Sequence, residues 1–139
     1  MLLRNCAGGV VFYEDTVLLI QNDKQEWAFP KGVIRKPKLS VDTAIERVKL
    51  ETGVDAAIVS SAGETSYEFY STTRKSPVCN FITWYIMRAD DNTVCANQEL
   101  GVTGGGFFPI EQAAQMITYS QDQSLLKLSY EKYHQLKTV

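Results

Sequence analysis

The sequence predicts an α/β sandwich, and three observations support this fold class. Runs of β-branched and aliphatic residues alternate with two segments of helical periodicity. One of these segments is central and the other is C-terminal, so strands are interleaved with helices along the chain. The 139 residues are 45% hydrophobic and 22% charged, which suits one ordinary globular core. We therefore expect a single domain over residues 1–139.

The N-terminal part of the chain is predicted to form a β-hairpin. Residues 4–13 and 16–21 are aliphatic and β-branched runs on either side of Glu14-Asp15. Gly8-Gly9 inside the first run predicts a bulge or the close approach of another backbone segment, because glycine has no side chain. A loop through residues 23–26 then leads to the segment Trp-Ala-Phe-Pro-Lys-Gly at residues 27–32.

The central helix is predicted over residues 40–52. Pro37 precedes it, Ser40 is a suitable N-cap, and Gly53 can adopt the left-handed conformation that ends a helix. The apolar positions are spaced for one buried face. They are Val41, Ala44, Ile45 and Val48.

The second half of the chain is predicted to add further strands and two helices. The strands cover residues 54–59, 67–70 and 78–88, with a turn-rich segment at 71–77 and a loop at 98–106 that is rich in glycine at its end. Phe107-Phe108 begins a short strand, and Pro109 can open a helix over residues 110–117. Ser120 can cap a last helix that reaches residue 136.

The composition restricts the classes of partner. A formal net charge of −2 gives no basic surface for binding long nucleic acids. No apolar run is long enough to span a bilayer, so we expect no membrane partner. Cys6, Cys79 and Cys95 are odd in number and lack CxxC spacing. We expect them to be small buried side chains in a reducing compartment, and we expect a cytoplasmic protein.

Residues 32–54 resemble the Nudix box of the Nudix hydrolase superfamily, which includes the MutT-like proteins. The family pattern is Gly, five residues, Glu, seven residues, Arg-Glu, an aliphatic residue, any residue, Glu-Glu, any residue, Gly, and an aliphatic residue. The positions in register are Gly32, Val48, Glu51, Gly53 and Val54. The resemblance covers nearly the whole chain and implies an α/β/α sandwich with a mixed sheet. It also implies pyrophosphohydrolase chemistry with Mg²⁺ held by the glutamates of the box.

Most of the box carboxylates are missing. Lys38 stands in place of the first Glu, Glu46-Arg47 reverses the Arg-Glu pair, and Leu50 replaces the first member of Glu-Glu. On a helix, residues 47, 50 and 51 share a face, which we expect to point away from the apolar stripe. Arg47 and Glu51 could also pair there, worth about 0.3 kcal/mol if exposed. Because Mg²⁺ needs oxygen ligands, we expect its binding to be weak or absent.

The segment before the box is similar to the Trp-x-Leu-Pro-Lys-Gly lead-in of the diadenosine polyphosphate and diphosphoinositol polyphosphate hydrolases. The resemblance places Lys31 at the mouth of the site, where it would bind phosphate. Arg47 could supply positive charge that metal supplies in relatives, and Tyr70 could stack on a nucleobase. Tyr67 and Tyr70 lie on opposite faces of a regular strand, so at most one of them can contact a ligand.

Three functional hypotheses follow from these residues. The first is a Nudix-fold protein that binds a nucleoside polyphosphate or dinucleoside polyphosphate and hydrolyses it weakly or not at all, with no cofactor. The second is an active hydrolase in which Glu51 is catalytic and Glu51 and Glu99 form an altered Mg²⁺ shell. The third is a regulatory or protein-interaction module. The lost carboxylates favour the first hypothesis over the second, and Lys31 favours the first over the third.

Overall fold

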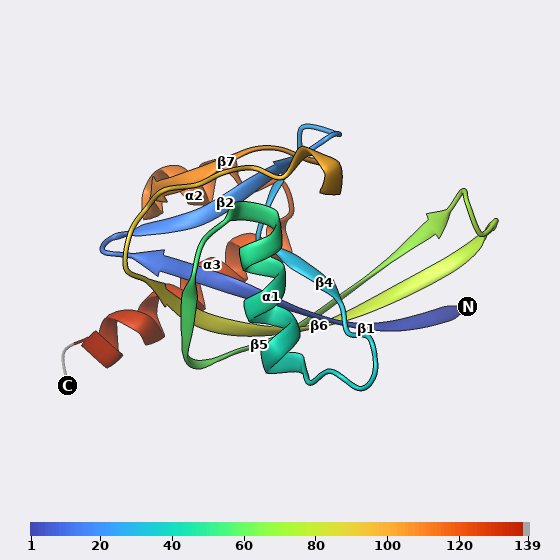
Figure 1. Cartoon of the computed structure of the whole chain (residues 1–139), viewed down its shortest axis with the longest axis horizontal. Helices are drawn as coiled ribbons and strands as arrows, with labels where there is room; N and C mark the ends of the chain where they lie inside the picture. Colours follow the sequence, from blue (N-terminus) through green and yellow to red (C-terminus); the bar gives the residue numbers. More distant parts are fainter. Residues whose placement is uncertain (138–139) are drawn as a thin grey trace.

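A computed structural model describes residues 1–137 as a seven-stranded mixed sheet with helices on both faces (Figure 1). The strands are β1 (Leu2–Tyr13), β2 (Thr16–Asn22), β3 (Trp27–Ala28), β4 (Lys31–Val33), β5 (Ala56–Ser71), β6 (Ser76–Ala89) and β7 (Val102–Pro109). The helices are α1 (Ser40–Thr52), α2 (Ile110–Met116), α3 (Ser120–Lys137) and the short 3₁₀ helix η1 (Gln98–Leu100). The predicted single domain ends in two residues that lie outside the described part of the chain.

The sheet divides into two branches beyond the first hairpin. Its main path is β3-β2-β1-β6-β5, with β4 added to β1 and β7 added to β2. β1 runs parallel to β6, and the other pairs are antiparallel, so the expected mixed sheet is confirmed. β1 and β2 pair beside their turn, at Phe12↔Val17 and Tyr13↔Thr16. Farther along, β1 pairs with β4 while β2 pairs with β3 and β7.

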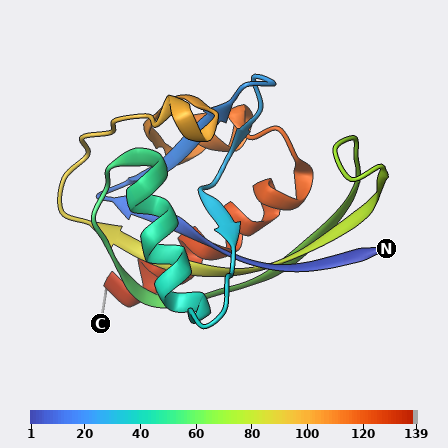
Figure 2. The ribbon, with the colours of Figure 1, turned by 45° about the vertical axis from the view of Figure 1, so that its right-hand side comes forward.

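Two hydrophobic clusters hold the helices against the sheet, and Figure 2 shows α1 on one face and α3 behind the other. On the α1 face, Ala44 and Val48 belong to a cluster with Val11 and Met87 of the sheet. On the opposite face, Ala113 of α2, Ile117 directly after it, and Leu125, Leu126 and Tyr133 of α3 pack with sheet residues that include Phe12 and Trp84. The fold is therefore the α/β/α sandwich that the resemblance implied.

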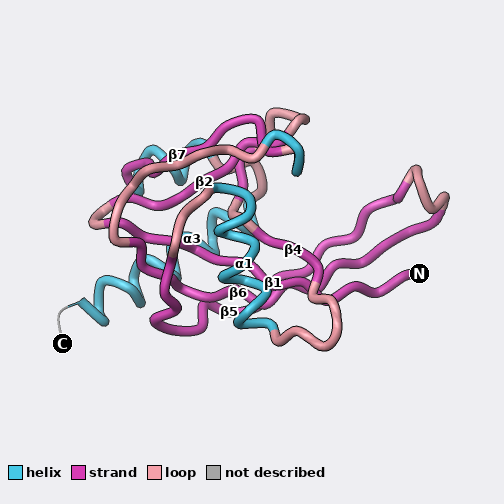
Figure 3. The backbone as a smooth tube through the Cα atoms, viewed as in Figure 1, coloured by secondary structure: helices cyan, strands magenta, loops and turns pink. Residues whose placement is uncertain are grey.

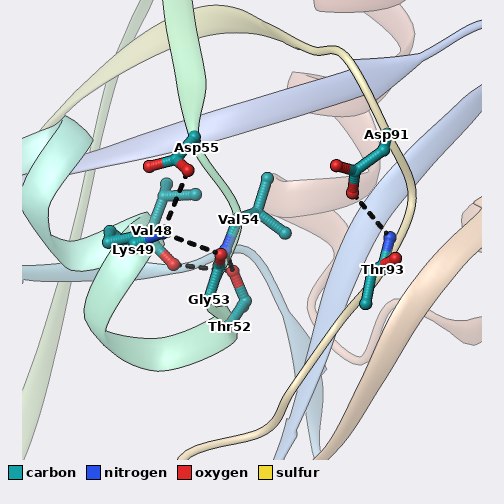
Figure 4. Close-up of polar contacts among 8 residues, drawn as sticks. All are labelled: Val48, Lys49, Thr52, Gly53, Val54, Asp55, Asp91 and Thr93. Atoms are coloured by element: carbon teal, nitrogen blue, oxygen red, sulfur yellow. Dashed lines mark hydrogen bonds and ion pairs between the residues drawn. The ribbon is translucent and has the colours of Figure 1, made fainter.

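The limits of α1 match the prediction, but its start has a different cause. Gly53 has φ +75°, and its N–H donates to the Lys49 carbonyl, which ends the helix as expected. Lys49 Nζ also donates to the Gly53 carbonyl and to Asp55 (Figure 4). Ser40 is not the N-cap. That position is Leu39, and Ser40 Oγ is instead hydrogen bonded to Tyr85 Oη of β6 at 2.5 Å.

The buried face of α1 also differs from the predicted stripe. Ile45 is 38% exposed, whereas Glu51 is only 4% exposed. The buried residues are Thr43, Ala44, Val48, Glu51 and Thr52. Glu51 follows Ala44 by two turns and Val48 by one, so it lies on the face that packs against the sheet rather than away from it.

Two further predictions need correction in the second half of the chain. Residues 56–71 form one strand, β5, which is bulged between Ile58 and Ser60 and between Ser61 and Gly63. β5, β6 and the start of β1 extend beyond the rest of the sheet as an arm (Figure 3). Residues 102–106 are a strand rather than a loop, because pairing with β2 overrides the low strand propensity of glycine.

The structure bears out the expected burial of two of the three cysteines. Cys6 and Cys79 are buried as expected, but Cys95 is exposed. Within residues 1–137, no helix is both long and apolar enough to cross a bilayer.

Gly8 and Gly9 mark a close backbone approach, as predicted. Gly9 N–H donates to the Pro30 carbonyl at 3.1 Å. A Cβ atom at Gly8 would lie 2.5 Å from the Pro30 carbonyl oxygen and 2.5 Å from the Trp84 ring. The segment before β4 therefore reaches β1 where β1 has no side chain.

Gly8→Ala is expected to destabilise the protein by about 1–3 kcal/mol, because the added methyl group overpacks a rigid contact. The free energy of unfolding from urea titration measures the loss. Gly104→Ala is the matched control, since its Cβ would come no closer than 3.7 Å to a neighbour. Equal stability of the two variants would contradict the close approach.

Candidate functional site

A cavity of about 670 Å³ lies between the arm of the sheet and the start of α3. This volume is in the range of small-molecule sites. Its walls come from the β2–β3 connection, β4, β5, β6 and residues 119–122. The lining residues are Asn22, Asp23, Lys24, Glu26, Ala28, Lys31, Thr65, Tyr67, Glu68, Phe69, Ile82, Trp84, Tyr119, Ser120, Gln121 and Asp122.

Lys31 lies where this cavity meets a second one of about 90 Å³, and it lines both. β4 holds it in place by pairing Lys31 with Gly8 of β1. Its Nζ lies 5.7 Å from the centroid of the Tyr67 ring, within reach of a cation–π contact. Burial raises the pKa of Glu51 and Asp122, and the Lys31 charge opposes that effect at both carboxyl groups. Lys31 is thus the cation at the centre of a group of carboxylates.

A hydrogen-bonded contact closes one side of the large cavity. Tyr119 donates its hydroxyl hydrogen to Glu26, which also accepts from Asn22 Nδ2 at 2.9 Å. These bonds lower the pKa of Glu26, and the bond to Glu26 raises the pKa of Tyr119 to about 12. Trp27 N–H donates to Thr118 Oγ1 at 2.9 Å, and Thr118 N–H donates to the Trp27 carbonyl at 3.2 Å. The residues before α3 are therefore joined to β3.

Asp122 brings a partly buried carboxyl group to the same cavity. It lies in the first turn of α3, and burial raises its pKa while the Lys31 charge opposes that effect. Asp122, Tyr119 and Glu26 were not predicted from the sequence, because contacts between distant parts of the chain bring them to the cavity. The predicted Ser120 cap indicated where α3 starts, but not that its first residues line the cavity.

The second cavity is where Glu51 reaches the site. It is lined by Ile20, Asn22, Glu26, Ala28, Phe29, Lys31 and Glu51. Burial raises the pKa of the Glu51 carboxyl group, and the nearby Arg47 and Lys31 charges oppose this effect without cancelling it. Glu51 and Lys31, both predicted as site residues, are therefore brought together.

Arg47 is paired with Glu51 from the preceding turn of α1. Its Nη2 and Nε donate to Glu51 Oε2 at 2.7 and 3.1 Å. The Arg47 side chain is 29% exposed and that of Glu51 is 5% exposed, so this is not the exposed pair considered from the sequence. Glu51 is the buried partner of this pair and Arg47 the partly exposed one, so loss of Arg47 would leave a buried carboxylate without its ion partner. Arg47 is not among the residues that line either cavity.

Comparison with known proteins identifies the family. The model of the NUDIX domain matches residues 2–128. The chain belongs to the Nudix family. The NUDIX domain of Shewanella oneidensis NrtR complexed with ADP ribose is similar, with a TM-score of 0.76 and 15% identity over 96% of this chain and 90% of that one.

Two further Nudix structures show the same fold. A NUDIX hydrolase from Nitrosomonas europaea has a TM-score of 0.74 and 17% identity, over 96% of this chain and 74% of that chain. A C. elegans Ap4A hydrolase binary complex has a TM-score of 0.70 and 17% identity, over 94% of this chain and 96% of that chain.

The donor set of this Nudix box does not fit the divalent metal ion that the family generally uses. Leu50, which is 44% exposed, offers no side-chain oxygen, and Arg47 occupies Glu51 Oε2. Glu99 lies on η1, where its N–H is bonded to Asn97, and it is exposed. Across residues 1–137, no three His, Cys, Asp or Glu side chains form a group that could hold a metal ion.

The residues at two altered positions of the box form an ion pair in which the two charges are exchanged relative to the family pattern. The Nudix pattern has Glu and Arg at the positions of Lys38 and Glu46, and these two side chains are ion-paired here. Both are close to half exposed, so the pair contributes only about 0.2–1 kcal/mol. Opposite charges are thus kept at these positions, and the departures that affect a metal site are Arg47 and Leu50.

Tyr67 lines the large cavity, whereas Tyr70, the aromatic residue predicted to stack on a nucleobase, does not. The Tyr67 hydroxyl accepts from Asn80 Nδ2 at 2.9 Å. Tyr70 is 63% exposed, lies opposite Pro77 near the end of β5, and is not a lining residue. Trp84 is buried, whereas Phe69 is 37% exposed.

Tyr119→Phe is expected to destabilise the protein most between mildly acidic and neutral pH. The pKa of Glu26 is lowered from 4.5, so the stabilisation from its charged form is present above that value and is lost as pH falls through the lowered pKa. Denaturant titrations of both proteins across this pH range measure the difference. Exposed Tyr70→Phe is the control, and a Tyr119→Phe effect that stays constant down to acidic pH would contradict this assignment.

Proposed function

We propose that this Nudix protein binds a nucleoside diphosphate-linked or dinucleoside polyphosphate ligand, with phosphate at Lys31 and a nucleoside part in the large cavity. We further propose that its metal-dependent pyrophosphohydrolase activity is weak or lost. The observation that carries the proposal is the position of Lys31 on the wall shared by both cavities. Its ammonium group can contact an anion that joins the two spaces.

The charges that line the large cavity support a division of the ligand between two parts. The lining carboxylates are Asp23, Glu26, Glu68 and Asp122, whereas the lining ammonium groups belong to Lys24 and Lys31. These carboxylates favour phosphate near Lys31 rather than beside them, and the hydroxyl and amino groups of a nucleoside can donate to them. Tyr67 supplies an aromatic surface beside Lys31. The ADP ribose and Ap4A named for the two structural neighbours are ligands of this composition.

The weak hydrolysis in this proposal follows from the box helix. Metal ions in such sites neutralise charge and lower the pKa of a bound water molecule. Arg47 neutralises Glu51 but cannot activate water in this way. The alternative of an active hydrolase requires Glu51 and Glu99 to assemble an altered Mg²⁺ shell, and it differs from our proposal in requiring metal for turnover.

Lys31→Ala is expected to weaken the binding of ADP-ribose or of a diadenosine polyphosphate by about tenfold or more, because a charge-assisted contact is worth roughly 1.5–3 kcal/mol. Binding to the wild type should persist without Mg²⁺ and should weaken as salt is added, since salt screens charge pairs. Isothermal titration calorimetry with and without Mg²⁺ measures both effects.

Lys36→Ala is the matched control, because Lys36 is exposed and lies outside both cavities. It should leave the affinity nearly unchanged. If wild type and Lys31→Ala bind both ligands equally poorly, the nucleotide proposal fails and an interaction module becomes the leading hypothesis. Mg²⁺-dependent release of nucleoside monophosphate at rates typical of enzymes would instead establish the active hydrolase.

A further inference from the structure

We infer that Arg47 is a built-in cation that takes the place of a divalent metal ion at Glu51, so that Glu51 is a positioning residue for Arg47 and Lys31. The inference goes beyond the proposed ligand, because it concerns how the box helix keeps its charge balanced. The side chains of the box helix do not provide the oxygen ligands that a divalent metal ion needs.

Glu51 requires a cation in this fold. Its side chain is 5% exposed and lies on the face of α1 that packs against the sheet. A carboxylate removed from water is costly unless it is paired and hydrogen bonded. In a metal-dependent site the bound ion provides this cation, so the buried carboxylate of such a site depends on metal for its charge balance. Here the chain itself provides the positive charge.

The geometry of Arg47 suits this role. Two of its N–H groups converge on the single oxygen Oε2 of Glu51, at 2.7 and 3.1 Å. The positive charge of Arg47 belongs to the chain itself, so this compensation does not depend on metal supply. Glu51 also lines the smaller cavity together with Lys31, the cation that lines both cavities.

Gly32 provides the space through which the Arg47 side chain reaches Glu51. A Cβ atom at Gly32 would lie 2.4 Å from both Cδ and Nε of Arg47. Gly32 pairs with Ala7 of β1, so the backbone on this side of Arg47 is held in the sheet. The side chain is therefore confined between β4 and α1, which limits its freedom to leave Glu51.

A divalent ion would have to displace this arrangement. Mg²⁺ binds oxygen at about 2.0–2.1 Å, and Glu51 Oε2 already accepts two hydrogen bonds. The guanidinium would repel the ion, and Leu50 would add no ligand. Restoring carboxylates at both positions should therefore reverse the preference of the site from the internal cation to the metal.

The experiment compares thermal unfolding of the whole chain in EDTA and in Mn²⁺, without nucleotide. Wild type should unfold at the same temperature in both. R47E/L50E should unfold at a lower temperature in EDTA, because carboxylates crowd around Glu51, and should gain about 4 °C or more in Mn²⁺ at tenfold excess over its dissociation constant. R47Q/L50Q is the matched control, which loses the Arg47 charge without adding carboxylates and should gain no such stability.

A titration of Mn²⁺ followed by electron paramagnetic resonance tests the wild type even if a double variant does not fold. We expect no Mn²⁺ to bind at Glu51, and wild type and Glu51→Gln to give the same titration. Saturable binding to wild type that Glu51→Gln abolishes would overturn the inference, as would a gain in unfolding temperature of wild type in Mn²⁺ that matches that of R47E/L50E. Because neither experiment uses a nucleotide, its outcome is independent of the Lys31 test.

Discussion

β1 and β2 leave their shared turn as a pair and then separate, and the space between them determines where the site can form. β4 pairs with β1 on one side of this space, while β3 and β7 pair with β2 on the other. The Pro30 carbonyl accepts from Gly9 between the branches, which directs Lys31 toward both cavities. The close contact at Gly8, the position of Lys31 and the contact between Lys31 and Glu51 all depend on this separation.

Local signals in the sequence were sufficient for the limits of α1 but not for its orientation. Gly53 ends the helix through its own backbone conformation, so its role could be inferred from neighbouring residues. The exposure of Ile45 and the burial of Glu51 depend on how α1 is rotated against the sheet. The two-turn spacing between Ala44 and Glu51 could have indicated that Glu51 is buried. Tyr119 and Asp122 are more than 80 residues from Lys31 in the sequence, and no local pattern indicates that the three line the same cavity.

The departures from the Nudix box are connected with one another rather than scattered. Lys38 and Glu46 exchange the signs of two charges but remain ion-paired. Arg47 and Glu51 bring opposite charges together where the family pattern has two carboxylates. In both cases the charge introduced at one position is balanced by a partner within α1 or directly before it. The helix therefore keeps a buried glutamate without needing a ligand from outside the chain.

The wall formed by the residues before α3 and the wall formed by β5 are attached to the rest of the fold in different ways. Residues 117–119 are fastened to β3 by the Thr118 hydrogen bonds and to the β2–β3 connection by Tyr119. Among the described strands, β5 is an edge strand that pairs only with β6, and its outer half belongs to the projecting arm. We therefore expect β5, which carries Tyr67, to bend when ligands of different width bind, while the residues before α3 keep their position.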